Sequence, residues 1–333
     1  MIETTIDVGR LDLVEGGRLG GVRQHATCYG TLNADRSNAI LVPHALTGSS
    51  RVAEWWKGLI GEDRLLDPRQ WYVIGINALG SCYGSTGPAS AAPNGSPYGS
   101  RFPQVTVRDI VRAQTRALER LGVERLALVI GGSLGGMQAL QWAVDFPERV
   151  RNAIVIGSHD HHSALGIALN AVQRDCILND PLQGIRTARK IAILTYKSDA
   201  LLRRRHGRNA DRAGRHRFDV EGYLEHQADL FERRMDPASY VALTRAMDSF
   251  DVRPPHPEPV ERRATQHTPA LRFVGISSDW LFQPSDVRAA AGRFAALGFD
   301  ARYLELQSEH GHDAFLAEPQ TLATLLATEI PGI

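Results

Sequence analysis

The chain has 333 residues, 43% of them hydrophobic, and a formal net charge of +1 at pH 7. A chain of this size can bury a large core, and we expect one large α/β domain with an insertion. The balanced charge argues against nucleic acid or an anionic membrane surface as the main partner. No signal peptide is evident at the start, and no run reaches the roughly 18–20 apolar residues of a membrane helix. We therefore expect a cytoplasmic protein.

Short apolar runs alternate with helical patterns, which is typical of a mostly parallel sheet with helices on its faces. The alternating segment 22–30 predicts an antiparallel edge strand. Further strands are predicted at 38–44, 71–77, 125–132, 151–158, 271–277 and 301–306. Helical spacing predicts helices at 106–122, 137–147 and near 318–330. A long Gly/Ser/Pro loop follows at 80–103, and loops of that length are usually functional or disordered.

The alternation breaks from about Asp160 to about Thr265, where strand patterns disappear and helical or irregular sequence takes over. We expect a helical cap, residues 160–265, inserted into an α/β core formed by residues 1–159 and 266–333. The Pro-rich segment 256–269 predicts the linker that returns to the core.

Residues 131–135 are Gly-Gly-Ser-Leu-Gly, which match the pattern G-x-S-x-G. The match is weak by itself, because an ordinary tight turn in a Gly-rich chain can carry it. Here it directly follows a predicted strand and directly precedes a helical pattern, as the nucleophile elbow of the α/β-hydrolase fold requires. The flanking glycines allow the sharp turn, and the helix N-terminus directs free N–H groups at a developing oxyanion. We predict an α/β-hydrolase fold with Ser133 as the nucleophile.

A serine hydroxyl is a poor nucleophile until a base removes its proton. In this fold an acid and then a histidine follow the serine along the chain. Asp279 stands just after the predicted strand 271–277 and is the expected acid. Asp248 and Asp251 are the alternatives, but they lie in helix-like sequence without a preceding strand, which is more typical of caps or surface acids.

The expected base is His312, because it follows the last predicted strand and stands at the start of the last helix. His310 is the alternative, and its other possible role is that of a structural neighbour. Two backbone N–H groups should bind the oxyanion. Leu134, directly after the nucleophile, supplies one, and Leu46 in the loop after an early strand is the expected second donor. A simple Gly-containing turn is the alternative structure for that loop.

Residues 159–163 are His-Asp-His-His-Ser and resemble a metal cluster. Neighbouring positions are not expected to point at one ion, so we expect exposed or capping histidines in a sheet-edge loop. Cys28, Cys82 and Cys176 lie far apart without a C-x-x-C pair, and each is expected to pack as a small apolar residue. The sequence carries no P-loop or dinucleotide-binding Gly loop. We expect neither a metal nor a redox cofactor.

With these residues in place, the chain resembles the homoserine O-acetyltransferase family, the methionine-pathway acyltransferases on an α/β-hydrolase fold. The resemblance covers nearly the whole chain, in blocks at 44–48, 77–90, 97–114, 131–143, 150–158, 188–196, 275–282 and 311–316. It implies ping-pong chemistry, in which Ser133 takes an acyl group from acyl-CoA and passes it to the hydroxyl of L-homoserine. His312 would act as base and then as acid in each half. Acetyl-CoA would be a co-substrate, and no bound cofactor is implied.

The resemblance also implies substrate contacts and an assembly. The family places a carboxylate-binding arginine and a tyrosine in the block at 188–196, here Arg189 and Tyr196. A planar guanidinium can bind a carboxylate through two parallel hydrogen bonds. Asp313, directly after the histidine, would hold the amino group. The structural alternatives are a helix arginine, a packed tyrosine and an N-terminal helix acid. A homodimer with the insertion at its interface is implied as well.

Two features depart from the family. Ser49-Ser50 stands where an aspartate commonly follows Leu-Thr-Gly, and the insertion is short, with a basic stretch at 201–218. That stretch could contact the phosphates of CoA, but we favour a solvated, mobile loop. Three functional alternatives stay open. They are a succinyl donor or serine acceptor within the family, an esterase or thioesterase that uses water, and a non-catalytic scaffold.

Overall fold

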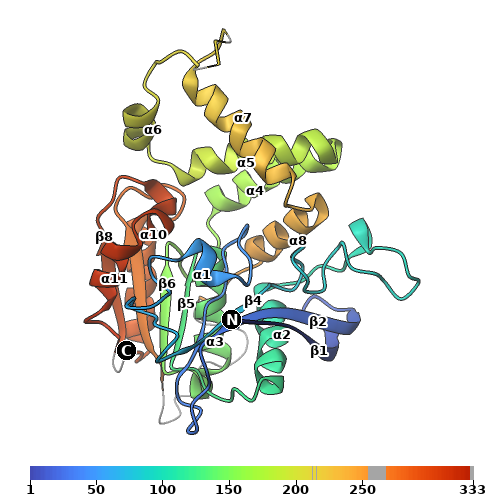
Figure 1. Cartoon of the computed structure of the whole chain (residues 1–333), viewed down its shortest axis with the longest axis vertical. Helices are drawn as coiled ribbons and strands as arrows, with labels where there is room; N and C mark the ends of the chain where they lie inside the picture. The colour runs from blue at the N-terminus through green and yellow to red at the C-terminus, as the bar shows by residue number, and fades with distance from the viewer. Residues whose placement is uncertain (212, 215, 254–267, 331–333) are drawn as a thin grey trace.

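The computed structural model describes residues 1–211, 213, 214, 216–253 and 268–330. An eight-stranded sheet in the order β1-β2-β4-β3-β5-β6-β7-β8 forms its centre (Figure 1). The strands are β1 (Ile2–Asp12), β2 (Arg18–Tyr29), β3 (Ala39–Leu41), β4 (Tyr72–Ile76), β5 (Leu128–Gly132), β6 (Asn152–Ile156), β7 (Ala270–Ile276) and β8 (Ala301–Leu306). β2 is antiparallel to β1 and to β4, and every later pair is parallel. The predicted mostly parallel sheet is confirmed.

The N-terminal strand was not predicted. β2 covers the antiparallel strand predicted at 22–30, but β1 pairs along its outer side, from Ile2 opposite Cys28 to Asp12 opposite Arg18. The prediction that 22–30 lies at the sheet edge is therefore wrong. The alternation of β1 is hard to recognise because the pairing shifts around Gly9, which has a φ of 75°. Such a bulge interrupts the two-residue period of buried side chains.

Helices cover both faces of the sheet, so successive strand residues enter different apolar clusters. On β5, Val129 packs in one cluster, while Leu128 and Ile130 pack in the other. The first cluster lies under α2 (Val107–Arg120), α3 (Leu134–Asp145) and α9 (Pro284–Ala296). The second lies under α1 (Val52–Trp55), α10 (Ala314–Ala317) and α11 (Pro319–Leu326). Burial on both faces explains why the parallel strands are continuous apolar runs in the sequence.

The predicted helices are present with shifted ends. α2 begins after Thr106, whose side chain and that of Asp109 form a reciprocal capping box, and the chain turns at Gly122 with a φ of 75°. α3 begins at Leu134, three residues before the predicted start, because the helix follows the serine turn directly. α11 lies within the range predicted for the terminal helix.

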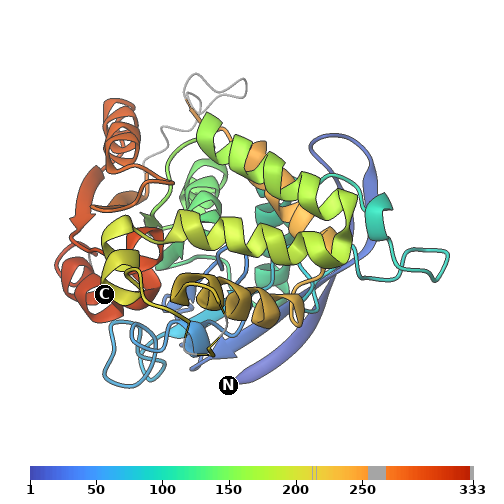
Figure 2. The same ribbon diagram turned by 90° about the horizontal axis from the view of Figure 1, so that it is seen from above.

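The segment after β6 forms helices that lie over the carboxyl ends of the strands (Figures 1 and 2). They are α4 (Ala164–Asn179), α5 (Pro181–Tyr196), α6 (Asp199–Arg205), α7 (Asp219–Glu232) and α8 (Pro237–Asp248). The segments that enter and leave this helical insertion lie side by side. His162 donates its N–H to the Phe250 carbonyl at 2.9 Å, and Val252 donates to the Asp160 carbonyl at 2.8 Å. The cap boundaries stay a prediction, and most of the linker predicted at 256–269 lies outside the described residues.

The basic stretch 201–218 is not a loop throughout, since α6 occupies its first five residues. Several of its charges are compensated by acids. Arg203 pairs with Asp199 at 2.8 Å, and Arg204 and Arg217 pair with Glu309 and Asp211. These three arginines are therefore already paired with acids, so fewer positive side chains are free to contact a phosphate group than the sequence suggested.

The loop at 80–103 contains one short 3-10 helix, Gly99–Arg101, and its first part is tied to β2. Thr86 donates its N–H to the Arg23 carbonyl at 2.8 Å. The Ser85 hydroxyl accepts from the His25 N–H at 2.9 Å and donates to the Asn77 carbonyl at 2.6 Å. This part of the loop therefore has a defined place beside the end of β4.

Cys28 is buried, Cys82 and Cys176 are partly buried, and none of the three forms a disulfide. In the part of the chain that the structure describes, no helix has both the length and the apolar character needed to cross a membrane.

Candidate active site

Ser133 occupies the sharp turn between β5 and α3. Its φ of 57° and ψ of −125° are values that L residues rarely adopt. The Ser133 N–H donates to the Ile156 carbonyl at the end of β6, at 2.9 Å. Such strain persists only where the surroundings hold the residue in place, and it clusters at functional sites. The predicted nucleophile is thus presented at the carboxyl edge of the sheet.

The glycines around Ser133 are required by close backbone contacts. A Cβ on Gly131 would lie 2.4 Å from the carbonyl group of Gly135, and one on Gly135 would lie 2.3 Å from the Pro43 carbonyl oxygen. A Cβ on Gly132 would lie 2.5 Å from the Phe315 ring. The motif therefore lets α3 pass directly against the segment after β3.

The acid and the base predicted from chain order form a hydrogen bond. Asp279 follows β7, and His312 lies in the 3-10 turn Gly311–Asp313 after β8. The His312 Nδ1 lies 2.7 Å from an Asp279 carboxylate oxygen. The other carboxylate oxygen accepts the N–H groups of Leu281 and Phe282, both at 2.9 Å. The backbone thus aims the carboxylate at the imidazole.

The free nitrogen of His312 is the one a serine would need. Among the described residues its buried Nε2 has no hydrogen-bond partner. An ionised carboxylate only accepts, so Nδ1 carries the proton and Nε2 of the neutral ring has the free lone pair. A Cβ built on Gly157 would lie 3.2 Å from the His312 ring. Gly157 directly follows Ile156, whose carbonyl accepts the hydrogen bond from the Ser133 N–H. The serine turn and the histidine therefore meet the same short segment.

Burial alone would lower the pKa of His312, but the charge and hydrogen bond of Asp279 outweigh it, so the pKa lies above the ordinary 6.5. The imidazolium that forms when a base accepts a proton is stabilised by the same carboxylate. This arrangement suits a base that later returns its proton as an acid.

The alternative residues have other partners. Asp248 ends α8 and is bonded to Arg174 at 2.6 Å and to Asn170 at 2.8 Å. Asp251 forms an exposed pair with Arg253. His310 lies 2.6 Å from Glu318 through its Nδ1, which gives it a structural role beside the predicted base.

Leu46 lies in a tight turn of the loop after β3. The Gly48 N–H donates to the Ala45 carbonyl at 2.9 Å, which places Leu46 and Thr47 at the two corners of a β-turn. Leu46 lines the same small cavity as Ser133. Within the described ranges, neither the Leu46 N–H nor the Leu134 N–H has an acceptor in the protein. Both are available to bind an oxyanion.

His44 holds this turn from the core. Burial lowers its pKa to about 4, so the ring is neutral near pH 7. Its Nε2 accepts the Ala78 N–H at 2.9 Å, so Nδ1 carries the proton and donates to the Ala45 carbonyl at 2.7 Å. Gln138 on α3 donates to the His44 carbonyl at 3.2 Å. The peptide that carries the Leu46 N–H is thereby fixed.

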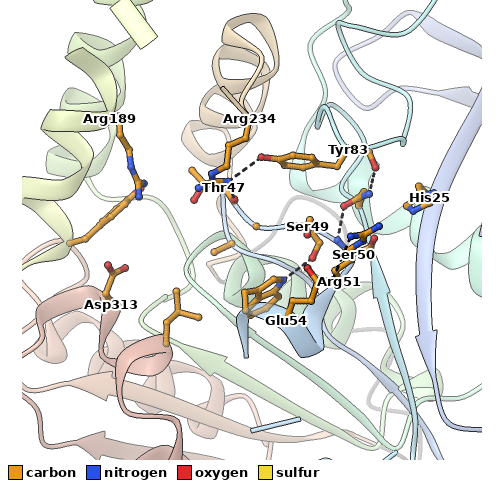
Figure 3. Close-up of a pocket in the computed structure, with 16 residues that line it drawn as sticks. His25, Thr47, Ser49, Ser50, Arg51, Glu54, Tyr83, Arg189, Arg234 and Asp313 are labelled. Atoms are coloured by element: carbon orange, nitrogen blue, oxygen red, sulfur yellow. Dashed lines mark hydrogen bonds and ion pairs between the residues drawn. The ribbon is translucent and has the colours of Figure 1, made fainter. Parts of the chain in front are cut away.

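Two cavities meet at Tyr196. The inner one, which Ser133 lines, has a volume of about 20 Å³, enough for about one water molecule. The outer one has a volume of about 710 Å³ and is lined from the core and from the helical insertion (Figure 3). Tyr196 lines both cavities, and burial raises its pKa to about 12, so the phenol stays protonated and can donate a hydrogen bond.

The outer cavity contains all three substrate residues that the family resemblance implied, Arg189, Tyr196 and Asp313. The Arg189 Nε is buried and has no hydrogen-bond partner in the described part of the chain. Asp313 is already engaged, since the Lys197 ammonium lies 2.8 Å from its carboxylate. The cavity thus offers a guanidinium and a carboxylate, and Figure 3 shows them at the same end of the cavity.

Sequence reasoning missed Lys197, Arg234 and Tyr83. Lys197 directly follows the block at 188–196, so its position was a usable signal. Arg234 donates to the Thr47 carbonyl at 2.7 Å and to the Tyr83 hydroxyl oxygen at 3.0 Å. No local pattern could have revealed these contacts, because they join residues more than 150 positions apart.

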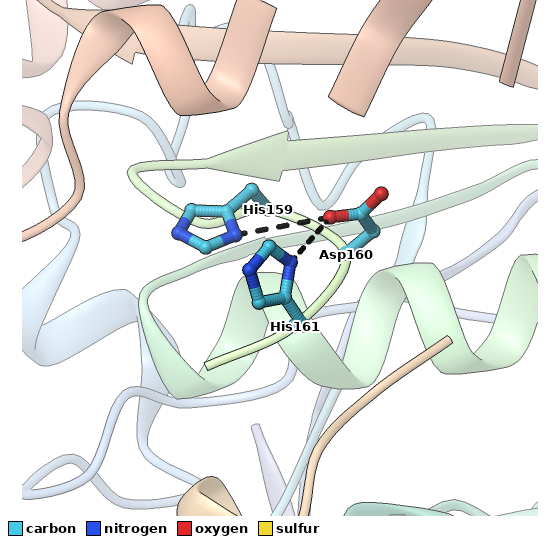
Figure 4. A group of neighbouring side chains, drawn as sticks. All are labelled: His159, Asp160 and His161. Carbon is cyan, nitrogen blue, oxygen red and sulfur yellow. Dashed lines mark hydrogen bonds and ion pairs between the residues drawn. The ribbon is translucent and has the colours of Figure 1, made fainter. Parts of the chain in front are cut away.

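The cluster at His159, Asp160 and His161 differs from its prediction (Figure 4). One possible metal-ligand atom from each of the three residues lies within 4.8 Å of the other two. The expectation that neighbouring positions cannot point at one ion is therefore wrong. His159 is also buried rather than exposed. Arg293 donates to both Asp160 oxygens, at 2.6 and 2.9 Å, and compensates the charge that a cation would need. The hydroxyl of Ser163, and not a histidine, caps α4, so the expected histidine cap is not present at this helix.

Comparison with known proteins agrees with this fold. Residues 38–190 match the family described as the alpha/beta hydrolase fold. The structure superposes on homoserine O-acetyltransferase from Bacillus anthracis with a TM-score of 0.90 at 21% identity, covering 99% of this chain and 97% of that one. Esterase E22 superposes with a TM-score of 0.89 at 24% identity, covering 99% of each chain. These likenesses establish the fold, and the chain is an α/β-hydrolase-fold protein.

Two relatives with similar sequences identify the family within the proteins of this fold. Homoserine O-acetyltransferase from Geobacter sulfurreducens is 42% identical over 94% of this chain and 92% of its own length. Homoserine O-succinyltransferase from Methylibium petroleiphilum is 43% identical over 86% of this chain and 82% of its own length. The chain belongs to the homoserine O-acyltransferase family of enzymes.

The pKa of His312 should depend on Asp279. In Asp279→Asn the charge that raises this pKa is gone while burial remains, so the pKa should fall from above 6.5 to below it. Titration of the His312 ring protons by NMR measures the shift. Asp251→Asn makes the same acid-to-amide change at the surface and should leave the titration unchanged. An unaltered His312 titration in Asp279→Asn would contradict the assignment.

Proposed function

We propose that this enzyme transfers an acyl group from acyl-CoA to the hydroxyl of L-homoserine through an acyl-enzyme on Ser133, as a step of methionine biosynthesis. The observation that carries the proposal is the outer cavity beside the serine, in which Arg189 and Asp313 offer opposite charges to an amino acid. The names of the sequence relatives support the same activity.

In the first half-reaction the Ser133 hydroxyl attacks the thioester carbonyl, and its proton passes to Nε2 of His312. The carbonyl oxygen becomes an oxyanion that accepts the N–H groups of Leu46 and Leu134. When the C–S bond breaks, His312 returns the proton to the CoA sulfur. Asp279 keeps the imidazole in the required tautomer and stabilises the imidazolium.

In the second half-reaction the homoserine hydroxyl gives its proton to His312 and attacks the acyl carbon. The same N–H groups bind the second oxyanion. The bond to Ser133 then breaks, the serine oxygen takes the proton from His312, and O-acylhomoserine leaves. Atoms and charges balance in both halves, and no metal or redox step is required.

Acceptor binding is assigned to charged groups of the outer cavity. Arg189 would bind the homoserine carboxylate, Tyr196 would donate a hydrogen bond, and Asp313 would bind the ammonium group. The substrate ammonium would take the place of Lys197, whose own ammonium neutralises Asp313 when the cavity has no acceptor. An uncharged alcohol makes neither of the two ionic contacts, which would favour homoserine over other hydroxyl compounds.

Acetyl-CoA is the proposed donor and succinyl-CoA is the alternative, since relatives with both names have nearly equal identity, 42% and 43%. A serine acceptor would need the same contacts at a shorter reach. The second candidate function is an esterase or thioesterase, in which water replaces homoserine. The inner cavity, with room for about one water, is the feature that would permit it.

Release of the CoA thiol distinguishes these functions. We expect release from acetyl-CoA to depend strongly on homoserine, and Ser133→Ala to reduce it at least about 10³-fold because the nucleophile is gone. Parallel assays with succinyl-CoA and with serine identify the donor and the acceptor. Ser96→Ala, in the exposed loop, is the matched control and should keep full activity. Equal release without any acceptor would establish water as the acceptor.

We further propose a homodimer with the helical insertion at its interface. Large apolar side chains are exposed along α4 and α5 of the insertion: Leu165, Ile167, Val172, Leu178, Leu182 and Leu194. Leu178 and Leu182 are 58% and 68% exposed, and they lie on either side of the junction between the two helices. A second copy of the chain would bury these side chains.

The double substitution Leu178→Glu and Leu182→Glu should convert the dimer to monomers, because it would bury charges at the interface. Sedimentation velocity measures the change. Leu297→Glu, at an equally apolar exposed site beyond α9, should leave the dimer intact. The proposed interface would be contradicted if the unmodified chain were a monomer. It would also be contradicted if the variant that carries both Leu178→Glu and Leu182→Glu stayed a dimer.

A further inference from the structure

Arg234 connects the helical insertion to the core at the mouth of the site. It follows α7, lines the outer cavity and lies beside Thr47 of the loop after β3 (Figure 3). One guanidinium nitrogen, Nη1, donates to the Thr47 carbonyl at 2.7 Å and to the Tyr83 hydroxyl oxygen at 3.0 Å. Both acceptors are uncharged oxygens, so these hydrogen bonds are made by an ion to neutral groups.

The Thr47 carbonyl is the start of a hydrogen-bond chain that ends at the oxyanion hole. It shares a peptide unit with the Gly48 N–H, and this N–H donates to the Ala45 carbonyl at 2.9 Å. The Ala45 carbonyl shares a peptide unit with the Leu46 N–H. Because a peptide unit is planar and trans, its C=O and N–H point in opposite directions and are oriented together. Two peptide units therefore join Arg234 to the Leu46 N–H.

The rest of this loop is held by residues of the core. Nδ1 of His44 donates to the Ala45 carbonyl at 2.7 Å, and the Trp55 indole donates to the Ser49 carbonyl at 2.9 Å. Thr47 lies between Ala45 and Ser49 in the chain, and its carbonyl accepts a hydrogen bond from Arg234 of the helical insertion. Residues of the core and a residue of the insertion therefore hold the turn in its orientation together.

We propose that Arg234 is a positioning residue for the oxyanion hole. Its guanidinium orients the Thr47 peptide and polarises it, so the Gly48 N–H becomes a stronger donor to Ala45. The Ala45 peptide is polarised in turn, and the Leu46 N–H becomes a stronger donor to the oxyanion. Hydrogen bonds in such a chain strengthen one another, more so where an ion starts the chain.

Arg234 is also packed together with Arg189, the residue proposed to bind the acceptor. The guanidinium carbons of Arg234 and Arg189 lie 5.1 and 4.9 Å from the centre of one ring, that of Phe231. The residue proposed to bind the acceptor carboxylate and the residue that supports the oxyanion turn are therefore packed on a common aromatic side chain. The proposal rests on the proposed function only in assigning Leu46 to the oxyanion, which applies equally to ester hydrolysis.

The test uses p-nitrophenyl acetate, an uncharged ester without the carboxylate, ammonium or phosphate groups that an arginine could bind directly. In Arg234→Met, acylation of Ser133 by this ester should slow about tenfold, less than the 10²–10³-fold that follows loss of an oxyanion donor itself. Arg234→Lys keeps a cationic donor and should stay within about threefold of the unmodified rate. Arg233→Met removes the neighbouring charge and should acylate at the unmodified rate.

Two outcomes would overturn the proposal. One is an unchanged ester acylation rate in Arg234→Met with only the KM for homoserine raised, which would make Arg234 a substrate contact. The other is Arg234→Lys as slow as Arg234→Met at equal thermal stability. If Arg234→Met does not fold, Arg234→Gln replaces it, and a rate equal to the unmodified rate there overturns the proposal. Ester acylation does not require a CoA donor, so failure of the transferase function would leave this test decisive.

Discussion

The serine turn is the constraint on which the rest of the site depends. Ser133 has a φ of 57°, which an L residue tolerates only under tight support from its neighbours. Its N–H is held by the end of β6, and the glycines beside it allow α3 to pass against the Pro43 carbonyl at distances that a Cβ would prevent. That approach puts the loop after β3 beside the nucleophile. The strained turn and the oxyanion loop are therefore parts of one packed arrangement.

Asp279 and His44 are buried, and specific partners orient each of them. Asp279 receives two backbone N–H groups and His312, so its charge is compensated without a cation. His44 is kept neutral by burial, which leaves it one donor for the Ala45 carbonyl of the oxyanion loop and one acceptor for the Ala78 N–H after β4. Buried polar groups without partners would cost several kcal/mol. The Nε2 of His312 is left free in this otherwise satisfied network, at the position where a proton must be received.

Much of this arrangement could be predicted because parallel strands bring their carboxyl ends to one edge. Chain order alone therefore placed Asp279 and His312 together, and the structure confirms their hydrogen bond. β1 was missed because a bulge at Gly9 breaks its alternation.

Arg234 could not be found from a local pattern, since its role comes from contacts with residues more than 150 positions away. Lys197 had a usable signal in its place directly after the block at 188–196, but its partner Asp313 lies more than 100 positions away. The cluster at His159 was misjudged because side-chain directions in an irregular loop do not follow from spacing. Local patterns predicted the parallel strands, but they did not reveal β1 or the contacts that Arg234 makes with distant segments.

The central claim is that Ser133 carries an acyl group that homoserine removes. Incubation with acetyl-CoA alone, removal of CoA, and peptide mass spectrometry would locate the acyl group, and a chase with homoserine would follow its fate. We expect acylation of the peptide that contains Ser133, and we expect the acyl group to pass to homoserine faster than to water. An unacylated serine, or an acyl group lost at the same rate with and without homoserine, would contradict it.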